Sequence, residues 1–173
     1  MICFACWRLS ASFAGVRARE LAVEYPTVTP DTSALDAVRL LAEQRLPGLL
    51  VVDSQGRAVA VITGSRLLRH IIPPHVRDDP ALARVYDEHH ADRLCARLGE
   101  RRVADLLGAE RGPLPVVDAD ATAMEIASVM SGAGSPMVAV SGEPDRVDAP
   151  VVGVVTAAQL FERLLPDQPG APA

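Results

Sequence analysis

The chain has 173 residues, of which 49% are hydrophobic, and this is enough for one or two compact cores. Its net charge of −5 argues against a nucleic-acid-binding surface, because phosphate backbones are bound by basic patches. Every basic residue is arginine, a bias that indicates GC-rich coding of bacterial type. The absence of lysine excludes a Walker-type phosphate loop and a Schiff-base enzyme, since both need that side chain.

Residues 1–14 are predicted to form a short N-terminal appendage, unless translation starts further along the chain. They are apolar, but no basic residue precedes the apolar run and Arg8 interrupts it, so a secretory signal is not indicated. No segment is long enough to span a membrane. Cys3 and Cys6 have C-x-x-C spacing, yet the only further cysteine is Cys95, so a zinc site would have to recruit histidines. We predict a cytoplasmic protein with reduced thiols, no metal and no membrane insertion.

The rest of the chain contains two similar segments, which align when Pro47 is placed on Pro136, an offset of 89 (136 − 47). The first reads "DTSALDAVRLLAEQRLPGLLVV" from Asp31, and the second reads "DATAMEIASVMSGAGSPMVAV" from Asp120. Both contain an S/T-x-x-D/E sequence, in which the hydroxyl accepts from an early backbone N–H and the acid complements the helix dipole. Two helix starts at equivalent positions favour an internal repeat.

Each copy continues with the same order of elements. Apolar residues recur at helical spacing, and a short apolar run follows, "LLVVD" or "MVAVS", which is typical of a buried strand. After a turn, a second apolar strand ends at Thr63 or Thr156, where the offset has grown to 93 (156 − 63), because the turn "SGEPDRVDAP" is longer than its counterpart. A closing helix is stopped by Pro73–Pro74 or by Pro166. Each copy is therefore predicted to be a strand–helix–strand–strand–helix unit of the α/β class.

We predict a first repeat at 15–72, a helical linker at 73–102, a second repeat at 103–165 and a tail at 166–173. In the linker, Asp79 with Pro80 favours a helix start and Gly99 a helix end. The chain's four histidines, two adjacent and two isolated, are interpreted as solvated rather than as metal ligands: His70, His75, His89 and His90.

The paired copies resemble a tandem of CBS domains, the motif named after cystathionine beta-synthase, which pairs into a Bateman module. The likeness lies in "VTPDTSALDAVRLLAEQRLPGLLVVDSQGRAVAVITGSRLL" and "VVDADATAMEIASVMSGAGSPMVAVSGEPDRVDAPVVGVVTAAQLF", with the lead-ins "VRARELA" and "VADLLGA". It implies two sheets related by an approximate twofold, with clefts between them, in a homodimer. It also implies a regulatory ligand such as AMP, ATP or S-adenosylmethionine, no required cofactor, and control of a separate partner protein.

The family's ligand pattern is G-h-x-T/S-x-x-D after the last strand, and both copies depart from it. The second keeps Gly153 and Thr156 but has Gln159 where the ribose-binding aspartate is expected. The first keeps Thr63, with Ala60 and Arg66 at the other two positions. Glutamine still offers neutral hydrogen bonds, and arginine can grip a phosphate.

By the resemblance, each cleft takes residues from both copies. We prefer the cleft with Gly153, because glycine would let a ligand approach the backbone; its residues are Thr29, Ala34, Leu46, Pro47, Gly153, Val154, Thr156, Ala158 and Gln159. The second cleft, less favoured because it places Asp118 near a phosphate, comprises Val61, Thr63, Ser65, Arg66, Asp118, Ala123, Ser135 and Pro136.

Two functions remain open, and a third is disfavoured. The chain is predicted to sense an adenosine-containing ligand, or alternatively to be a degenerate pair that only dimerises or docks a partner. In the second case both threonines merely cap their helices. No catalytic motif such as G-x-S-x-G or H-E-x-x-H occurs, so an enzyme is not predicted.

Overall fold

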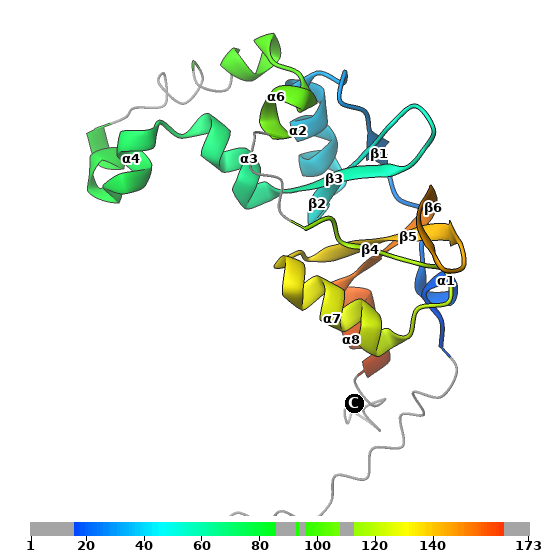
Figure 1. Ribbon diagram of the computed structural model, residues 1–173. Coiled ribbons are helices and arrows are strands. Elements are labelled where there is room, and N and C mark those ends of the chain that lie inside the picture. Colours follow the sequence, from blue (N-terminus) through cyan, green and yellow to red (C-terminus); the bar gives the residue numbers. More distant parts are fainter. Residues whose placement is uncertain (1–15, 86–92, 94–95, 108–112, 165–173) are drawn as a thin grey trace, which may run out of the picture.

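The computed structural model describes residues 16–85, 93, 96–107 and 113–164 (Figure 1). The first repeat contains β1 (Thr27–Val28), α2 (Ala34–Glu43), β2 (Gly48–Val52), β3 (Ala58–Thr63) and α3 (Gly64–Ile71). The second contains β4 (Val116–Val117), α7 (Ala123–Ala133), β5 (Met137–Glu143), β6 (Arg146–Thr156) and α8 (Ala157–Leu164). The predicted α/β class and the predicted order of elements are confirmed.

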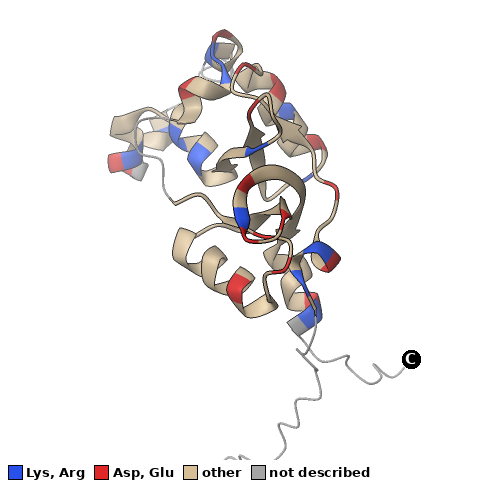
Figure 2. Cartoon of the chain, turned by 45° about the vertical axis from the view of Figure 1, so that its right-hand side comes forward, with Lys and Arg blue, Asp and Glu red and all other residues tan. Residues whose placement is uncertain are grey.

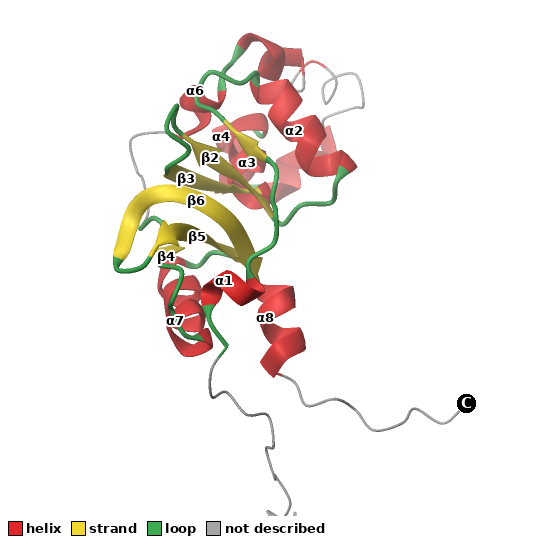
Figure 3. Ribbon diagram, turned by 90° about the vertical axis from the view of Figure 1, so that its right-hand side faces the viewer, coloured by secondary structure: helices red, strands yellow, loops and turns green. Residues whose placement is uncertain are grey.

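The two sheets have the same topology and matching registers. In each, a short strand runs parallel to the central strand, which pairs antiparallel with the last one. Val28 pairs with Val51 in the first sheet, and Val117 pairs with Val140 in the second, so both partners shift by the 89 residues of the sequence repeat. The sheets face each other, with the helices of each repeat on the outside (Figure 3).

A shared apolar core joins the facing sheets. It is formed by five buried residues from strands of both repeats: Leu50, Val52, Met137, Ala139 and Val154. A backbone hydrogen bond from Val151 to the carbonyl of Gly56, 2.9 Å long, adds a polar contact between the two hairpins. The repeats therefore hold each other in place through buried apolar surface, the main stabilising term in folding.

Both predicted helix starts are present, but only one is a full capping box. The Thr122 hydroxyl accepts from the Glu125 N–H, and Glu125 accepts in return from the Thr122 N–H at 2.6 Å, which lowers the pKa of Glu125. In α2, Ser33 accepts from the Asp36 N–H at 3.5 Å, while the Asp36 carboxylate contacts Arg39. Aspartate is one methylene shorter than glutamate, so it does not complete the reciprocal bond.

The lead-in segments are exchanged between the repeats. Helix α1 (Ala18–Leu21) packs in the core of the second repeat, and α6 (Val103–Leu107) packs in the core of the first. The contacts are equivalent, since the Ala18 N–H donates to Ala121 at 2.8 Å and the Val103 N–H donates to Thr32 at 2.9 Å. Figure 1 shows α6 beside α2 and α1 beside β6. Each folded core therefore takes its lead-in helix from the other copy.

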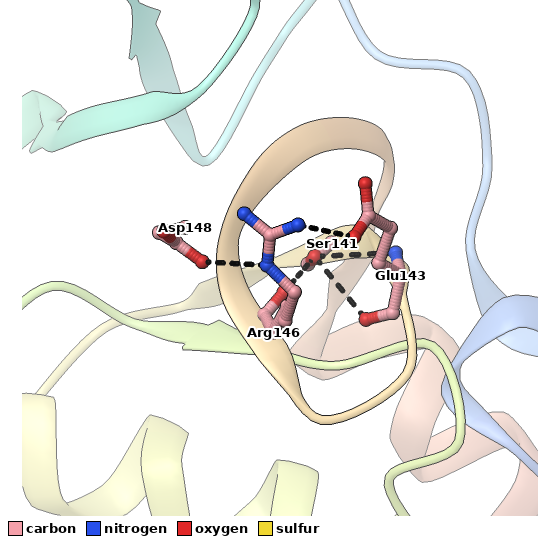
Figure 4. A network of polar contacts seen from close by, with 4 residues as sticks. All are labelled: Ser141, Glu143, Arg146 and Asp148. Carbon is pink, nitrogen blue, oxygen red and sulfur yellow. Dashed lines mark hydrogen bonds and ion pairs between the residues drawn. The ribbon is translucent and has the colours of Figure 1, made fainter.

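The segment predicted as the longer turn of the second repeat, Ser141–Pro150, is instead part of a β-hairpin. Strands β5 and β6 run through it, and Glu143 pairs with Arg146. The Ser141 hydroxyl is buried and donates to the Arg146 carbonyl, while the Arg146 guanidinium lies 2.7 Å from Glu143 and 3.4 Å from Asp148 (Figure 4). The contacts of Ser141 and Glu143 with Arg146 cross the hairpin and support strand pairing where turn residues predicted a loop.

Short helices occupy the described parts of the linker, where one helix was predicted. After Pro73, α4 (Pro74–Asp78) begins at a proline, which is favourable at the first helical position. Asp79 then accepts from the Ala81 N–H at the start of the 3-10 helix η1 (Pro80–Val85), and a second 3-10 helix, η2 (Arg97–Glu100), precedes α6.

Several predictions fall outside the described residues, namely those on His89, His90, Cys95, the N-terminal C-x-x-C segment and the tail. None of the described helices is both long enough and apolar enough to cross a membrane.

Candidate functional site

A pocket of about 160 Å³ opens between the repeats, and we call it the inter-repeat pocket. One wall comes from β3 and the first turn of α3. The other comes from the chain leading into β4 and from the end of α7. Its lining residues are Val59, Ala60, Val61, Thr63, Arg66, Leu107, Pro113, Leu114, Pro115, Ala133, Gly134 and Ser135.

Thr63 caps α3 at the polar end of this pocket. Its hydroxyl accepts from the Arg66 N–H at 3.4 Å and lies 3.0 Å from the Ser65 hydroxyl. The first turn of a helix carries unpaired N–H groups and the positive end of the helix dipole. This wall is therefore suited to an anionic or hydroxyl-bearing group.

Arg66 adds a full positive charge to the same wall. Its guanidinium donates to the Leu107 carbonyl at 2.6 Å, which ties α3 to the end of the exchanged helix α6. Arginine stands here at the position of the family's aspartate. A group that meets this wall would thus be held by a cation instead of a carboxylate, which favours phosphate over ribose hydroxyls.

The remaining walls are mostly apolar. Val59 and Val61 from β3 lie across from Leu114 and its two flanking prolines. Ser135 contributes a hydroxyl, but that hydroxyl donates to the Met137 carbonyl at 2.6 Å. Apolar walls with a few polar groups are typical of small-molecule sites, whose volumes usually reach about 300–1,000 Å³. The smaller pocket here would enclose only part of a nucleotide.

The structure brings together half of the predicted second cleft, namely Val61, Thr63, Arg66 and Ser135. Ser65 lies beside it through its contact with Thr63. The other three predicted residues lie elsewhere. Asp118 accepts from the Asp120 N–H within its own turn, Ala123 is buried in the second-repeat core, and Pro136 lines a hollow between α7 and α8.

In the preferred cleft, Thr156 and Gln159 form hydrogen bonds with each other. The Gln159 carbonyl oxygen accepts from the Thr156 N–H at 2.8 Å and from the Thr156 hydroxyl at 2.9 Å, while the Gln159 N–H donates back to that hydroxyl. This is the reciprocal pattern of a capping box with glutamine as the returning side chain. A ribose contact by the Gln159 carbonyl oxygen would have to replace these two hydrogen bonds.

Gly153 lies against the exchanged lead-in, a contact that sequence reasoning did not predict. A Cβ at this position would lie 2.8 Å from the Val23 carbonyl oxygen and 3.0 Å from the Ala22 Cβ. Val23 and Val154 exchange two backbone hydrogen bonds, each 3.0 Å long. The glycine therefore allows a close approach by the protein backbone of the lead-in, and its predicted ligand contact stays a prediction.

Tyr25 further distinguishes the preferred cleft from the inter-repeat pocket. It is the repeat equivalent of Leu114, and its hydroxyl donates to the Gly48 carbonyl at 2.6 Å. Partial burial raises the pKa of Tyr25 to about 12, so it stays neutral, and its ring packs against the core shared by the sheets.

The other preferred-cleft residues are dispersed. Ala34 and Val154 are fully buried, Leu46 packs against the first-repeat core, Pro47 and Ala158 are exposed, and Thr29 bonds to Thr32 within its own turn. Binding in that cleft stays a prediction, while the inter-repeat pocket is lined by Thr63 and not by Thr156. Sequence reasoning missed Leu107 and Pro113–Pro115, and the only signal for them was the lead-in "VADLLGA" and its continuation.

Comparisons with known proteins agree with this architecture. The family model for the CBS domain matches residues 18–73. A CBS-domain-containing protein of unknown function from Kribbella flavida is 38% identical, with a TM-score of 0.73, and the alignment covers 87% of this chain and 99% of that one. A search of curated proteins found no match.

Two more distant structures share the fold. CBSX2, solved in complex with AMP, is 20% identical with a TM-score of 0.59, over 87% of this chain and 96% of that one. Hypoxic Response Protein I, solved with two coordinated zinc ions, is 19% identical with a TM-score of 0.58, over 87% of this chain and all of that one (100%).

Proposed function

This chain belongs to the CBS-domain proteins, and from that premise we propose that it is a regulatory module that binds an adenosine-containing ligand weakly between its repeats. AMP, ATP and S-adenosylmethionine are the candidates, and the bound state is read by a separate partner protein. The observation that carries the proposal is the inter-repeat pocket, which joins a helix N-terminus and Arg66 to apolar walls.

The chemistry of the pocket suggests how such a ligand would be oriented. A phosphate would meet the first turn of α3 and the Arg66 guanidinium, because both favour negative charge. The base would lie between the β3 side chains and Leu114. CBSX2, of the same fold, was solved with AMP, which supports this ligand class.

We expect the affinity to be low. The family's aspartate is absent from both copies, and the loss of one charge-assisted hydrogen bond costs about 1.5–3 kcal/mol, or roughly ten- to a hundredfold in Kd. If an intact site binds with a micromolar Kd, this loss gives an expected Kd of roughly tens of micromolar or weaker.

A thermal-shift assay with the three ligands tests the proposal. A ligand that binds only the folded state stabilises it by about 2.7 kcal/mol at one hundred times its Kd, so a concentration series up to several millimolar should raise the melting temperature progressively. If none of the three ligands raises it, the chain is a scaffold. The Gln159→Asp variant addresses the other cleft, because tighter binding by this variant would place the site at Thr156.

The alternative function, dimerisation, is favoured by one surface. An apolar hollow of about 500 Å³ lies between α7 and α8, lined mainly by Met130, Pro136, Leu160 and Phe161. Phe161 is 59% exposed and Met124 is 67% exposed. On the first repeat, η2 covers the corresponding helix α2, and Leu98 of η2 is buried in the first-repeat core. We propose that the bare α7–α8 face pairs with that of a second copy, since a twofold contact uses the same patch on both subunits.

The Phe161→Asp variant should therefore shift the protein from dimer to monomer. A charge at the centre of an apolar interface is left buried and unpaired. Sedimentation at micromolar concentration should give twice the chain mass for the unaltered protein and the single chain mass for the variant. Val85→Asp, at an 81% exposed position in η1, is the matched control and should remain dimeric. A monomeric unaltered protein would refute the dimer.

A further inference from the structure

A second pocket lies at the C-terminal end of α3, whereas the inter-repeat pocket lies at the N-terminal end of that helix. We call this second pocket the arginine pocket. It has a volume of about 310 Å³ and sits where the end of α3, the Pro73–Pro74 turn and η2 meet. Its lining residues are Arg69, His70, Ile71, Ile72, Pro73, Pro74, Arg97, Leu98 and Arg101.

Three arginines and no carboxylate line this pocket. Over most of the chain, acidic and basic positions are interspersed (Figure 2), and arginines such as Arg19, Arg57 and Arg146 pair with nearby acids at 2.6–2.7 Å. In the part of the chain that the structure describes, no carboxylate lies within ion-pair distance of Arg69, Arg97 or Arg101. Three arginines without a paired acid among the described residues are unusual in a chain whose net charge is −5.

The electrostatic environment of His70 agrees with a positive potential. Burial is the main cause that lowers the pKa of His70, and the charges of Arg101, Arg66 and Arg77 lower it further, against a hydrogen bond to the backbone of Leu106. The dipole of α3 opposes this potential, because it places about half a negative charge at the C-terminal end of the helix. Each of the three arginines that line the pocket carries a full positive charge.

We propose that the arginine pocket binds a phosphate-type oxyanion, the mono- or diphosphate group of a small molecule. Guanidinium groups match phosphate geometry with paired N–H donors. The apolar walls, formed by Ile72, Pro73 and Leu98 among others, can hold a non-polar part of the carrier molecule. The volume is near the lower end of the range for small-molecule sites. This site is separate from the one assigned to the adenosine ligand and does not depend on it.

Calorimetry with inorganic pyrophosphate tests the site directly. The double variant Arg97→Gln, Arg101→Gln should bind pyrophosphate at least about tenfold more weakly than the unaltered protein, because each lost guanidinium removes a charge-assisted contact. Arg163→Gln in α8, also exposed, removes the same charge far from the pocket and should leave the affinity unchanged. All three pocket arginines are exposed, so an unaltered melting temperature verifies that the double variant is folded.

Two further measurements sharpen the result. ADP that binds more tightly than pyrophosphate, with the difference lost in the Arg97→Gln, Arg101→Gln variant, indicates a carrier in contact with the apolar walls of the arginine pocket. Equal binding of ADP and pyrophosphate indicates the free anion. Bound pyrophosphate should also raise the pKa of His70 in NMR titrations, since its negative charge opposes that of Arg101 in the same pocket and those of Arg66 and Arg77 nearby. The proposal is wrong if pyrophosphate does not bind at millimolar concentration. It is also wrong if the double variant binds pyrophosphate as tightly as the unaltered protein does.

Discussion

Replacing Leu106 by alanine is expected to destabilise the protein by about 2–5 kcal/mol, the usual cost of removing a fully buried leucine side chain. Leu106 lies in α6, has no exposed surface and packs in the core of the first repeat. Its sequence position is in the lead-in of the second repeat. The loss should therefore appear in the first repeat, and NMR shifts should change in α2 and β2 more than in α7 and β5.

Leu68→Ala is the matched control for this prediction. Leu68 lies in α3 and is 53% exposed, so its truncation should change the free energy of unfolding far less, by roughly 0.5 kcal/mol or less. Urea denaturation measures both values. A Leu106→Ala cost below that of Leu68→Ala, or shift changes confined to the second repeat, would contradict the exchange of lead-ins.

The Gly153→Ala variant should also be strongly destabilised, although it adds a single methyl group. The new Cβ would come within 2.8 Å of the Val23 carbonyl oxygen, which is backbone and cannot rotate away. The lead-in must then move off β6 or the strand must bend, and overpacking of this kind costs about 1–3 kcal/mol. Hydrogen exchange at the Val23 and Val154 amides should accelerate, because these amides form the two bonds that hold the lead-in.

The Gly132→Ala variant is the matched control, and its stability should change in the opposite direction. Gly132 lies within α7, and a Cβ there meets no atom within 4 Å. Alanine in a helix is favoured over glycine by about 0.5–1 kcal/mol, so this variant should be stabilised. If Gly153→Ala were as stable as the unaltered protein, Gly153 would not serve the packing of the lead-in.

Local signals account for most of the fold that could be predicted. The caps at Ser33 and Thr122 and the strands ending at Thr63 and Thr156 depend on nearby residues, so the sequence order revealed them. The exchange of α1 and α6 depends on which core each short helix reaches. Their apolar residues, such as Leu21 and Leu106, suit either core, and nothing in the sequence distinguishes the two arrangements.

The site was harder to predict because the same residue types serve two purposes. Gly153 is equally consistent with a ligand and with a crossing backbone, and the structure adds the second role by placing Val23 against it. Gln159 is equally consistent with a ribose contact and with a cap, and its bonds to Thr156 favour the cap. The pocket instead formed around Thr63 and Arg66, where sequence reasoning saw a missing glycine and a missing acid.

The measurement that most directly tests the central claim is calorimetry of AMP with Thr63→Ala and Thr156→Ala. Both threonines cap a helix by accepting from the N–H three residues on, so both variants should lose similar stability, about 1 kcal/mol. Only Thr63 lines the inter-repeat pocket. We predict that Thr63→Ala weakens AMP binding severalfold and that Thr156→Ala leaves it unchanged. Equal affinity in both variants, or a loss confined to Thr156→Ala, would contradict a ligand site at Thr63.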